Sequence, residues 1–117
     1  MKLFVHSRVG GTVRIQLQGR VSQRDLSASE EPLGELLGED AYAQKLLVDM
    51  SEVASLDSSG VNWLLICQKR VRQPGGRMVL HSLSQIDKNV IKVLNLQAVF
   101  RLADDESQAL RLLEEQT

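Results

Sequence analysis

The stretch that decides the fold is residues 45–65, which read KLLVDMSEVASLDSSGVNWLL. Its first six residues, 45–50, form an apolar run of strand length without alternation, which is typical of a central strand covered by helices. Over residues 60–73 the apolar side chains recur at helical spacing. Between the two patterns lies DSS at 57–59, whose side-chain oxygens suit the free first-turn amides of a helix. The stretch therefore predicts a buried strand that leads into a helix.

The residues that follow extend this pattern into a βαβ unit. Pro74-Gly75-Gly76 ends the predicted helix, and the β-rich segment RMVLHS at 77–82 comes next. A strand, a helix and a second strand within about thirty residues form a βαβ unit. Because such crossovers join parallel strands, segments 45–50 and 77–82 are expected to be parallel.

The C-terminal part of the chain continues with helix and strand signals. The segment SQIDKNVIKVLNL at 84–96 predicts a helix that ends near Asn95. Four apolar residues share one stripe of this helix: Ile86, Val90, Val93 and Leu94. A short strand is predicted at 99–102, VFRL, and a last helix over 104–117, where leucines recur at helical spacing.

Two short β-rich segments, 3–9 and 12–17, flank a Gly-Gly pair near the N-terminus and predict a hairpin. In the segment 22–40, a leucine pattern predicts a short helix that is entered near Pro32 and ended by Gly38. The fold class that results is α/β, with a four- to five-stranded mixed sheet, an N-terminal hairpin, parallel central strands and about four helices mostly on one face.

Length and composition indicate one globular domain over residues 1–117. A chain of 117 residues suits one hydrophobic core, and 43% hydrophobic with 25% charged residues is ordinary globular composition. With 14 Lys+Arg against 15 Asp+Glu, the formal net charge is -1. The charge therefore predicts no direct binding to nucleic acid or to an anionic membrane.

Several absences in the sequence bear on location and cofactors. The single cysteine, Cys67, lies in an apolar run and fits a buried thiol in a reducing compartment. The N-terminus lacks the apolar core of a signal peptide, and the longest apolar run, WLLIC, is too short to cross a bilayer. His6 and His81 have no partners at metal-ligand spacing. A cytoplasmic protein without metal, cofactor or direct membrane insertion is expected.

Residues 49–60 carry the motif D-x-S-x-V-x-x-x-D-S-S-G, in which spacing, strand and helix agree. This motif, with the downstream segments GGRMVLHSLSQIDKNVIKVLNL and FRL, resembles the STAS family of sulphate-transporter C-terminal domains and bacterial anti-sigma-factor antagonists. The resemblance covers most of the chain and is to the stand-alone anti-sigma-factor antagonist type. It implies a single STAS-like domain.

The resemblance also implies a regulatory site. In stand-alone members, a partner that is both anti-sigma factor and serine kinase phosphorylates the first serine after the aspartate, which here is Ser58. A cognate phosphatase reverses the modification, and only the unphosphorylated antagonist binds the anti-sigma factor and frees the sigma factor. One position departs from the family pattern, because Ser22 follows Gly19-Arg20-Val21 where an acid is usual.

The residues around Ser58 can have structural roles as well as roles in partner binding. Asp57 or Ser59 is expected to cap the helix, and Gly60 either only starts it or lets a partner backbone approach closely. At about 100° per residue, the helical face predicted to lie on the sheet is formed by Gly60, Val61, Leu64, Cys67 and Val71. The residues predicted to contact a partner are Asp57, Ser59, Gly60, Asn62, Trp63 and Ile66.

For two of these residues, the sequence leaves two possible roles open. Ile66 falls on the side of the helix opposite the sheet, with Asn62, and is either a lone exposed apolar residue or part of a partner-docking stripe beside Ser58. Trp63 falls on the boundary and is either a core-edge residue or an interface anchor.

Three function classes follow from the sequence. The first is a regulatory binding module switched at Ser58. The second is a cytosolic STAS subunit of a membrane transport or scaffold complex without phospho-switching, which Ser22 in place of the acid favours. The third, an enzyme with a serine nucleophile, needs a nearby base and usually a G-x-S-x-G elbow, which the chain lacks, so no enzyme is expected.

Overall fold

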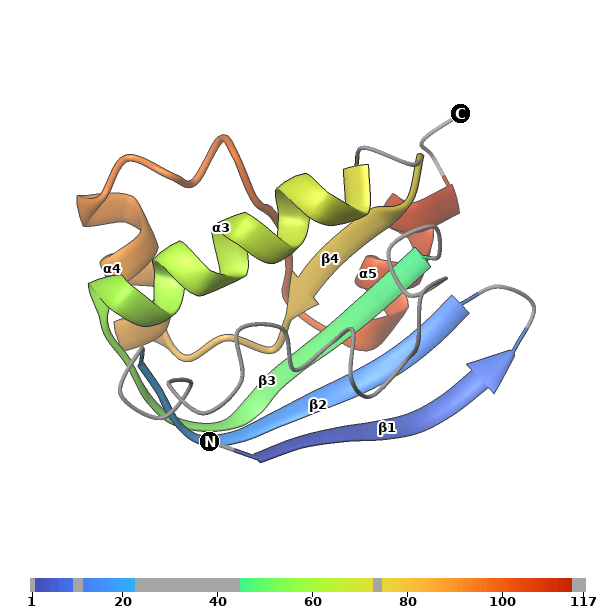
Figure 1. Cartoon of the computed structure of the whole chain (residues 1–117), viewed down its shortest axis with the longest axis horizontal. Coiled ribbons are helices and arrows are strands. Elements are labelled where there is room, and N and C mark those ends of the chain that lie inside the picture. Colours follow the sequence, from blue (N-terminus) through green and yellow to red (C-terminus); the bar gives the residue numbers. More distant parts are fainter. Residues whose placement is uncertain (1, 10–11, 23–44, 73–74, 115–117) are drawn as a thin grey trace.

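The computed structural model describes residues 2–9, 12–22, 45–72 and 75–114, which form five strands and three helices (Figure 1). The strands are β1 (Lys2–Val9), β2 (Thr12–Val21), β3 (Lys45–Leu56), β4 (Arg77–His81) and β5 (Arg101–Ala103). The helices are α3 (Ser58–Arg72), α4 (Gln85–Val93) and α5 (Glu106–Glu114). The helix predicted between Pro32 and Gly38 lies outside the described residues.

All five strands lie in one mixed sheet in the order β1-β2-β3-β4-β5. Strand β1 runs antiparallel to β2, whereas β3 is parallel to both β2 and β4, and β5 is parallel to β4. The predicted hairpin and the parallel central strands are confirmed. Strand β3 is six residues longer than predicted, because β2 continues beside it until Val21 pairs with Leu56.

Helix α3 packs one stripe of side chains on the sheet. The residues predicted to face the sheet are all buried: Gly60, Val61, Leu64, Cys67 and Val71. Asn62 and Ile66 are exposed, so the predicted phase of this helix is confirmed. Burial raises the pKa of the Cys67 thiol to about 12, so the thiol stays protonated and behaves as a small apolar side chain.

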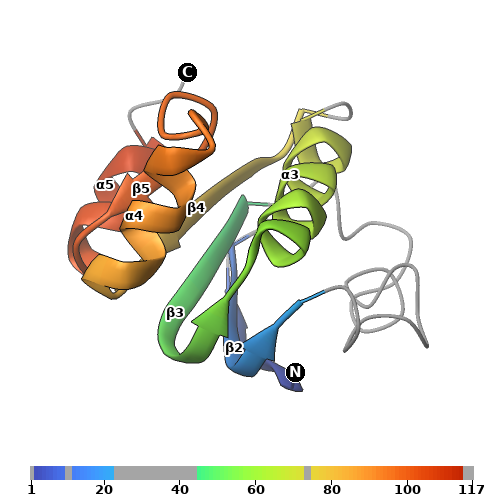
Figure 2. The same ribbon diagram turned by 90° about the vertical axis from the view of Figure 1, so that its left-hand side faces the viewer.

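The described helices cover both faces of the sheet. Helix α3 and Ile91 of α4 belong to the main core cluster, whereas α5 packs on the other face (Figure 2). The second cluster consists of Leu47, Val79, Ala103, Ala109 and Leu113. Two of the three described helices therefore share one face, as predicted, and α5 is the exception. The central strands β3 and β4 carry apolar side chains on both faces, which requires cover on both.

Helix α4 buries only a narrow side. Ile91 is fully buried and Asp87 is 3% exposed, whereas Ile86 is 74% and Val93 is 80% exposed. The apolar stripe predicted for this helix is therefore mostly a surface feature. Among the described residues, no helix combines the length and the apolar character that a membrane span requires.

Candidate functional site

The turn between β3 and α3 is held by the side chain of Asp57. Its Oδ1 accepts a hydrogen bond from the Gly60 N–H at 2.9 Å and from the Ser59 hydroxyl at 2.6 Å. The Asp57 carbonyl accepts the first helical bond, from the Val61 N–H at 3.0 Å. Asp57 is therefore the N-cap of α3. Hydrogen bonds from the Ser59 hydroxyl and the Gly60 N–H lower the pKa of the Asp57 carboxyl.

Ser58 is the exposed first residue of α3. Its hydroxyl has no hydrogen-bond partner among the described residues, in contrast to the Ser59 hydroxyl. The first turn of a helix presents free amides and the positive end of the helix dipole, which together favour an anion. Ser58 therefore offers a free hydroxyl where an added phosphate is electrostatically tolerated, while Ser59 serves the cap.

The substitution Asp57→Ala is expected to lower the free energy of unfolding by about 1 kcal/mol at neutral pH, because the cap bond to Gly60 is lost. The folded-state pKa of Asp57 is depressed, so this stabilisation is complete above the ordinary value of 3.8 and disappears as the pH falls through the folded value. Urea unfolding of both proteins at neutral pH and at about pH 2 measures the difference.

Ser59→Ala is the matched control for the cap, because it removes one donor to the same carboxylate but leaves the bond from Gly60. We expect a smaller loss than for Asp57→Ala. A larger loss for Ser59→Ala would show that Ser59, not Asp57, holds the first turn.

Gly60 is buried against the end of β2. A Cβ atom at this residue would lie 2.0 Å from the Val21 carbonyl oxygen and 3.1 Å from Cδ1 of Leu56. The same carbonyl accepts a hydrogen bond from the Asp57 N–H at 3.4 Å. In this structure, the backbone that closely approaches Gly60 thus belongs to the chain itself. Residue 60 is glycine because the end of β2 occupies the space of a side chain.

The end of β2 also borders the site. Ser22, which stands where the family pattern has an acid, is 4% exposed and follows directly after Val21. Arg20 is exposed, and its positive charge makes a small contribution to the lowered pKa of Asp57, after the hydrogen bonds from Ser59 and Gly60. Residues 20–22 therefore bring a cation and a hydroxyl, but no carboxylate, to this side of the site.

An apolar groove with a volume of about 390 Å³ runs beside Ser58. Its lining consists of Ser58, Ile86, Asn89, Val90, Val93 and Leu94. The apolar stripe of α4 thus shares one groove with the candidate phosphorylation site. The sequence showed the stripe, but nothing in the sequence placed it beside Ser58. Exposed apolar side chains that gather around one groove make it a candidate surface for contact with another protein.

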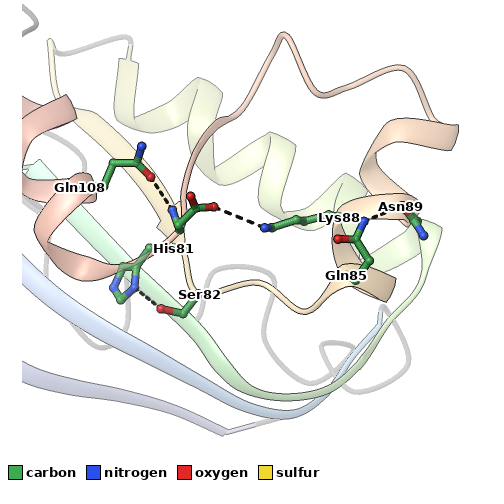
Figure 3. Close-up of polar contacts among 7 residues, drawn as sticks. His81, Ser82, Gln85, Lys88, Asn89 and Gln108 are labelled. Atoms are coloured by element: carbon green, nitrogen blue, oxygen red, sulfur yellow. Dashed lines mark hydrogen bonds and ion pairs between the residues drawn. The ribbon is translucent and has the colours of Figure 1, made fainter.

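Polar contacts surround α4 where it forms the groove. The Ser84 hydroxyl caps the helix by accepting the Asp87 N–H at 3.1 Å. Lys88 Nζ lies 3.4 Å from Asp104 Oδ1, and the Asp104 N–H donates to Gln108 Oε1 at 2.6 Å (Figure 3). These contacts join the first turns of α4 to the segment that enters α5. Because these contacts are exposed, they add little stability, and the fully buried Ile91 is what holds α4 on the sheet.

The remaining residues predicted to contact a partner lie elsewhere on α3. Asn62 is exposed and Ile66 is 40% exposed, on the side away from the sheet. Trp63 is 8% exposed and belongs to the main core cluster, as in the core-edge reading. None of these three is among the described residues that line the groove. In the described part of the chain, no group of His, Cys, Asp and Glu side chains forms a metal-binding cluster.

Comparisons with known proteins agree with this architecture. A family model described as "Mlab, STAS domain" matches residues 5–112. A candidate anti-sigma factor antagonist from Thermotoga maritima has a similar solved structure, with 18% identity, a TM-score of 0.81 and coverage of 93% of this chain and 92% of that chain.

Two further proteins illustrate the range of the fold. SpoIIAA, an anti-sigma factor antagonist, matches in its unphosphorylated form with 18% identity, a TM-score of 0.69 and coverage of 97% of this chain and 99% of that chain. The Bacillus SpoIIAA structure in the phosphorylated form matches with 19% identity and a TM-score of 0.67. The match covers 95% of this chain and 99% of that chain. The murine anion transporter Solute Carrier 26 family member A9 gives 15% identity and a TM-score of 0.73, with 92% of this chain matching 18% of that chain.

Proposed function

This chain belongs to the STAS domain family, and from that premise we propose that it is a regulatory protein-binding module, similar to anti-sigma-factor antagonists and switched by phosphorylation of Ser58. Its proposed partners are an anti-sigma factor that is also a serine kinase and a cognate phosphatase. The module acts by binding and not by catalysis, in the cytoplasm, where the partner supplies ATP. The observation that carries the proposal is that Ser58, which is exposed and whose hydroxyl has no hydrogen-bond partner among the described residues, borders an apolar groove.

The groove gives the switch a physical basis. With an unmodified Ser58, the lining is almost entirely apolar, and a partner that covers it gains the free energy of removing apolar surface from water. A phosphate on Ser58 adds a charge of about -1.5 to -2 at the same groove. Docking would then bury a strongly hydrated dianion beside the Asp57 carboxylate, so binding of the partner weakens.

The fold itself is expected to tolerate the phosphate. Ser58 is exposed at the N-terminus of α3, where the helix dipole favours an anion by about 0.3 to 1 kcal/mol. The cap made by Asp57 does not use the Ser58 hydroxyl. The modification is therefore expected to change the surface while leaving the core intact, which is what a reversible switch requires.

The test compares Ser58→Asp and Ser58→Ala in binding to a candidate anti-sigma kinase from the native host of this protein. Ser58→Asp is expected to lower the affinity by about tenfold or more, because a charge must be desolvated on docking. Ser58→Ala is expected to keep the affinity but to resist release by ATP. Melting temperatures of both variants should stay close to that of the unmodified chain.

Mass spectrometry of the chain after incubation with that kinase and ATP locates the phosphate. Ser59→Ala is the matched control and is expected to accept phosphate at Ser58. Phosphate on Ser59, or binding without phosphorylation of either serine, would contradict the proposed switch.

A second candidate function is a cytosolic subunit of a membrane transport or scaffold complex without phospho-switching. Ser22 in place of the usual acid favours it, and the same fold occurs within 18% of an anion transporter chain. Purification of the tagged chain from its native host separates the two functions. A stoichiometric membrane complex with an unmodified Ser58 supports the second, and a soluble ATP-binding kinase supports the first.

A further inference from the structure

Strand β3 has a neighbour on both sides only along its first part. Strand β4 pairs with residues 45–49 of β3 and ends at His81, whereas β2 stays beside β3 as far as Leu56 (Figure 1). No strand of the described residues pairs with residues 50–56 on the β4 side. A central strand of the sheet therefore becomes an edge strand just before Asp57 and Ser58.

The backbone at Ser82 ends β4 and turns the chain away from β3. Ser82 has a φ of 62°, which lies outside the β region, so the strand does not continue. Its N–H donates to the Ala103 carbonyl of β5 at 3.3 Å, and its hydroxyl forms a hydrogen bond with His81 Nδ1 at 2.8 Å (Figure 3). The free edge of β3 therefore follows from how β4 is terminated.

The side chains along this edge are open to solvent. Ser51, Glu52, Ala54 and Ser55 are exposed, whereas residues 45–50 of the same strand are buried or half-buried. A strand edge presents unpaired N–H and C=O groups, which are a template for an added strand. At two places along this stretch β3 has one residue more than β2, and such bulges bend a strand. A short flexible segment can follow this bend better than a long regular strand.

The charge of this stretch indicates which kind of segment fits. Residues 49–57 contain three acids, Asp49, Glu52 and Asp57, and no Lys or Arg. Arg20 of β2, which pairs with Ser55, offsets one of these charges. Glu52 has no hydrogen-bond or ion-pair partner among the described residues. A second copy of this chain would bring its own acids to the same edge, so like charges oppose self-pairing.

We infer that residues 51–55 of β3 bind a basic, extended segment of another protein, which joins the sheet as an added strand. Main-chain hydrogen bonds hold the segment, and a Lys or Arg side chain opposite Glu52 pairs with its carboxylate. The inference stands apart from the proposed switch, because it uses the backbone of β3 and neither the Ser58 hydroxyl nor the groove beside it.

Titration of the full chain with a capped peptide of alternating lysine and threonine, about six residues long, tests this inference by NMR. Hydrogen exchange is expected to slow by about tenfold or more at those amides of residues 51–55 that are not bonded to β2, because the peptide backbone accepts their N–H groups. The amides bonded to β2 should change little. A matched peptide of alternating glutamate and threonine is expected to bind at least about tenfold more weakly.

Glu52→Lys is expected to weaken binding of the basic peptide by about tenfold or more, because attraction becomes repulsion. Glu114→Lys is the matched control, since Glu114 is exposed on α5 and lies outside this edge. It should leave the affinity unchanged, as should Ser58→Ala, and all three variants should keep their melting temperatures. The test uses neither a kinase nor ATP, so its failure would leave the proposed switch standing.

Unchanged exchange at residues 51–55 with millimolar peptide, or an equal loss of affinity in Glu114→Lys, would overturn the inference. Equal binding of the glutamate peptide would overturn the choice of a basic segment. Exchange at this edge that slows as the concentration of the chain alone is raised would overturn it in favour of pairing between two copies.

Discussion

Replacement of Gly60 by alanine is expected to remove a large part of the folding free energy of this protein. The new Cβ atom would lie 2.0 Å from the oxygen and 2.7 Å from the carbon of the Val21 carbonyl, and both are backbone atoms. No rotamer change can relieve a contact between a Cβ atom and a strand. The end of β2 and the first turn of α3 must therefore separate, which also breaks the bond from the Asp57 N–H to Val21.

The expected loss is more than about 4 kcal/mol, against a total of about 5 to 15 kcal/mol for a typical domain. Urea unfolding followed by circular dichroism measures it. Gly75→Ala is the matched control, since a Cβ atom there meets nothing within 4 Å and only the φ of +92° is unfavourable. That change should cost about 1 to 2 kcal/mol. A similar small loss for Gly60→Ala would contradict the close approach of Val21.

The second large effect is expected for partner binding. Val93→Lys places a charge in the groove beside Ser58. The substitution is expected to weaken binding of the proposed anti-sigma kinase by about 30-fold or more, because an apolar contact at the centre of the proposed interface is lost. This expectation rests on the proposed function. The fold should tolerate the change, since Val93 is 80% exposed and lysine is favoured near the C-terminus of a helix.

Two matched substitutions locate the docking surface. Ile66→Lys tests the exposed side of α3, and Phe4→Lys is a control on the edge strand β1, where Phe4 is 42% exposed. All three variants should keep their melting temperatures. If Ile66→Lys abolishes binding while Val93→Lys does not, the surface is the α3 stripe and not the α4 groove. Equal loss in all three would show that added charge, not position, weakens binding.

The parts of the fold that local sequence patterns determine were predictable. The Gly-Gly pair between two β-rich segments predicted the hairpin, and the apolar spacing after Gly60 predicted which side of α3 is buried. The length of β3 was not predictable from residues 51–56, where polar and apolar side chains are mixed without a clear strand pattern, and the strand continues there because β2 pairs with it. Pairing partners far apart in the chain leave no local trace.

The candidate site shows the same limit. Asp57 and Ser59 were equal candidates for the cap, and only the geometry shows that the Asp57 carboxylate accepts the Gly60 N–H while Ser59 supports it. An apolar stripe has the same helical period whether it faces the core or the solvent. The stripe of α4 could therefore be read from the sequence, but its place beside Ser58 could not, because it depends on how α4 sits relative to α3.

The order of strands across the sheet has a consequence for how the chain folds during its synthesis. Each strand pairs with the strand that precedes it in the sequence, from β1 to β5. When a strand leaves the ribosome, its neighbour has already been made, and no later strand must be inserted between two that have paired. The sheet can therefore grow from one edge, with the three-residue β5 added last. Such growth limits the time for which an unpaired inner strand is open to aggregation.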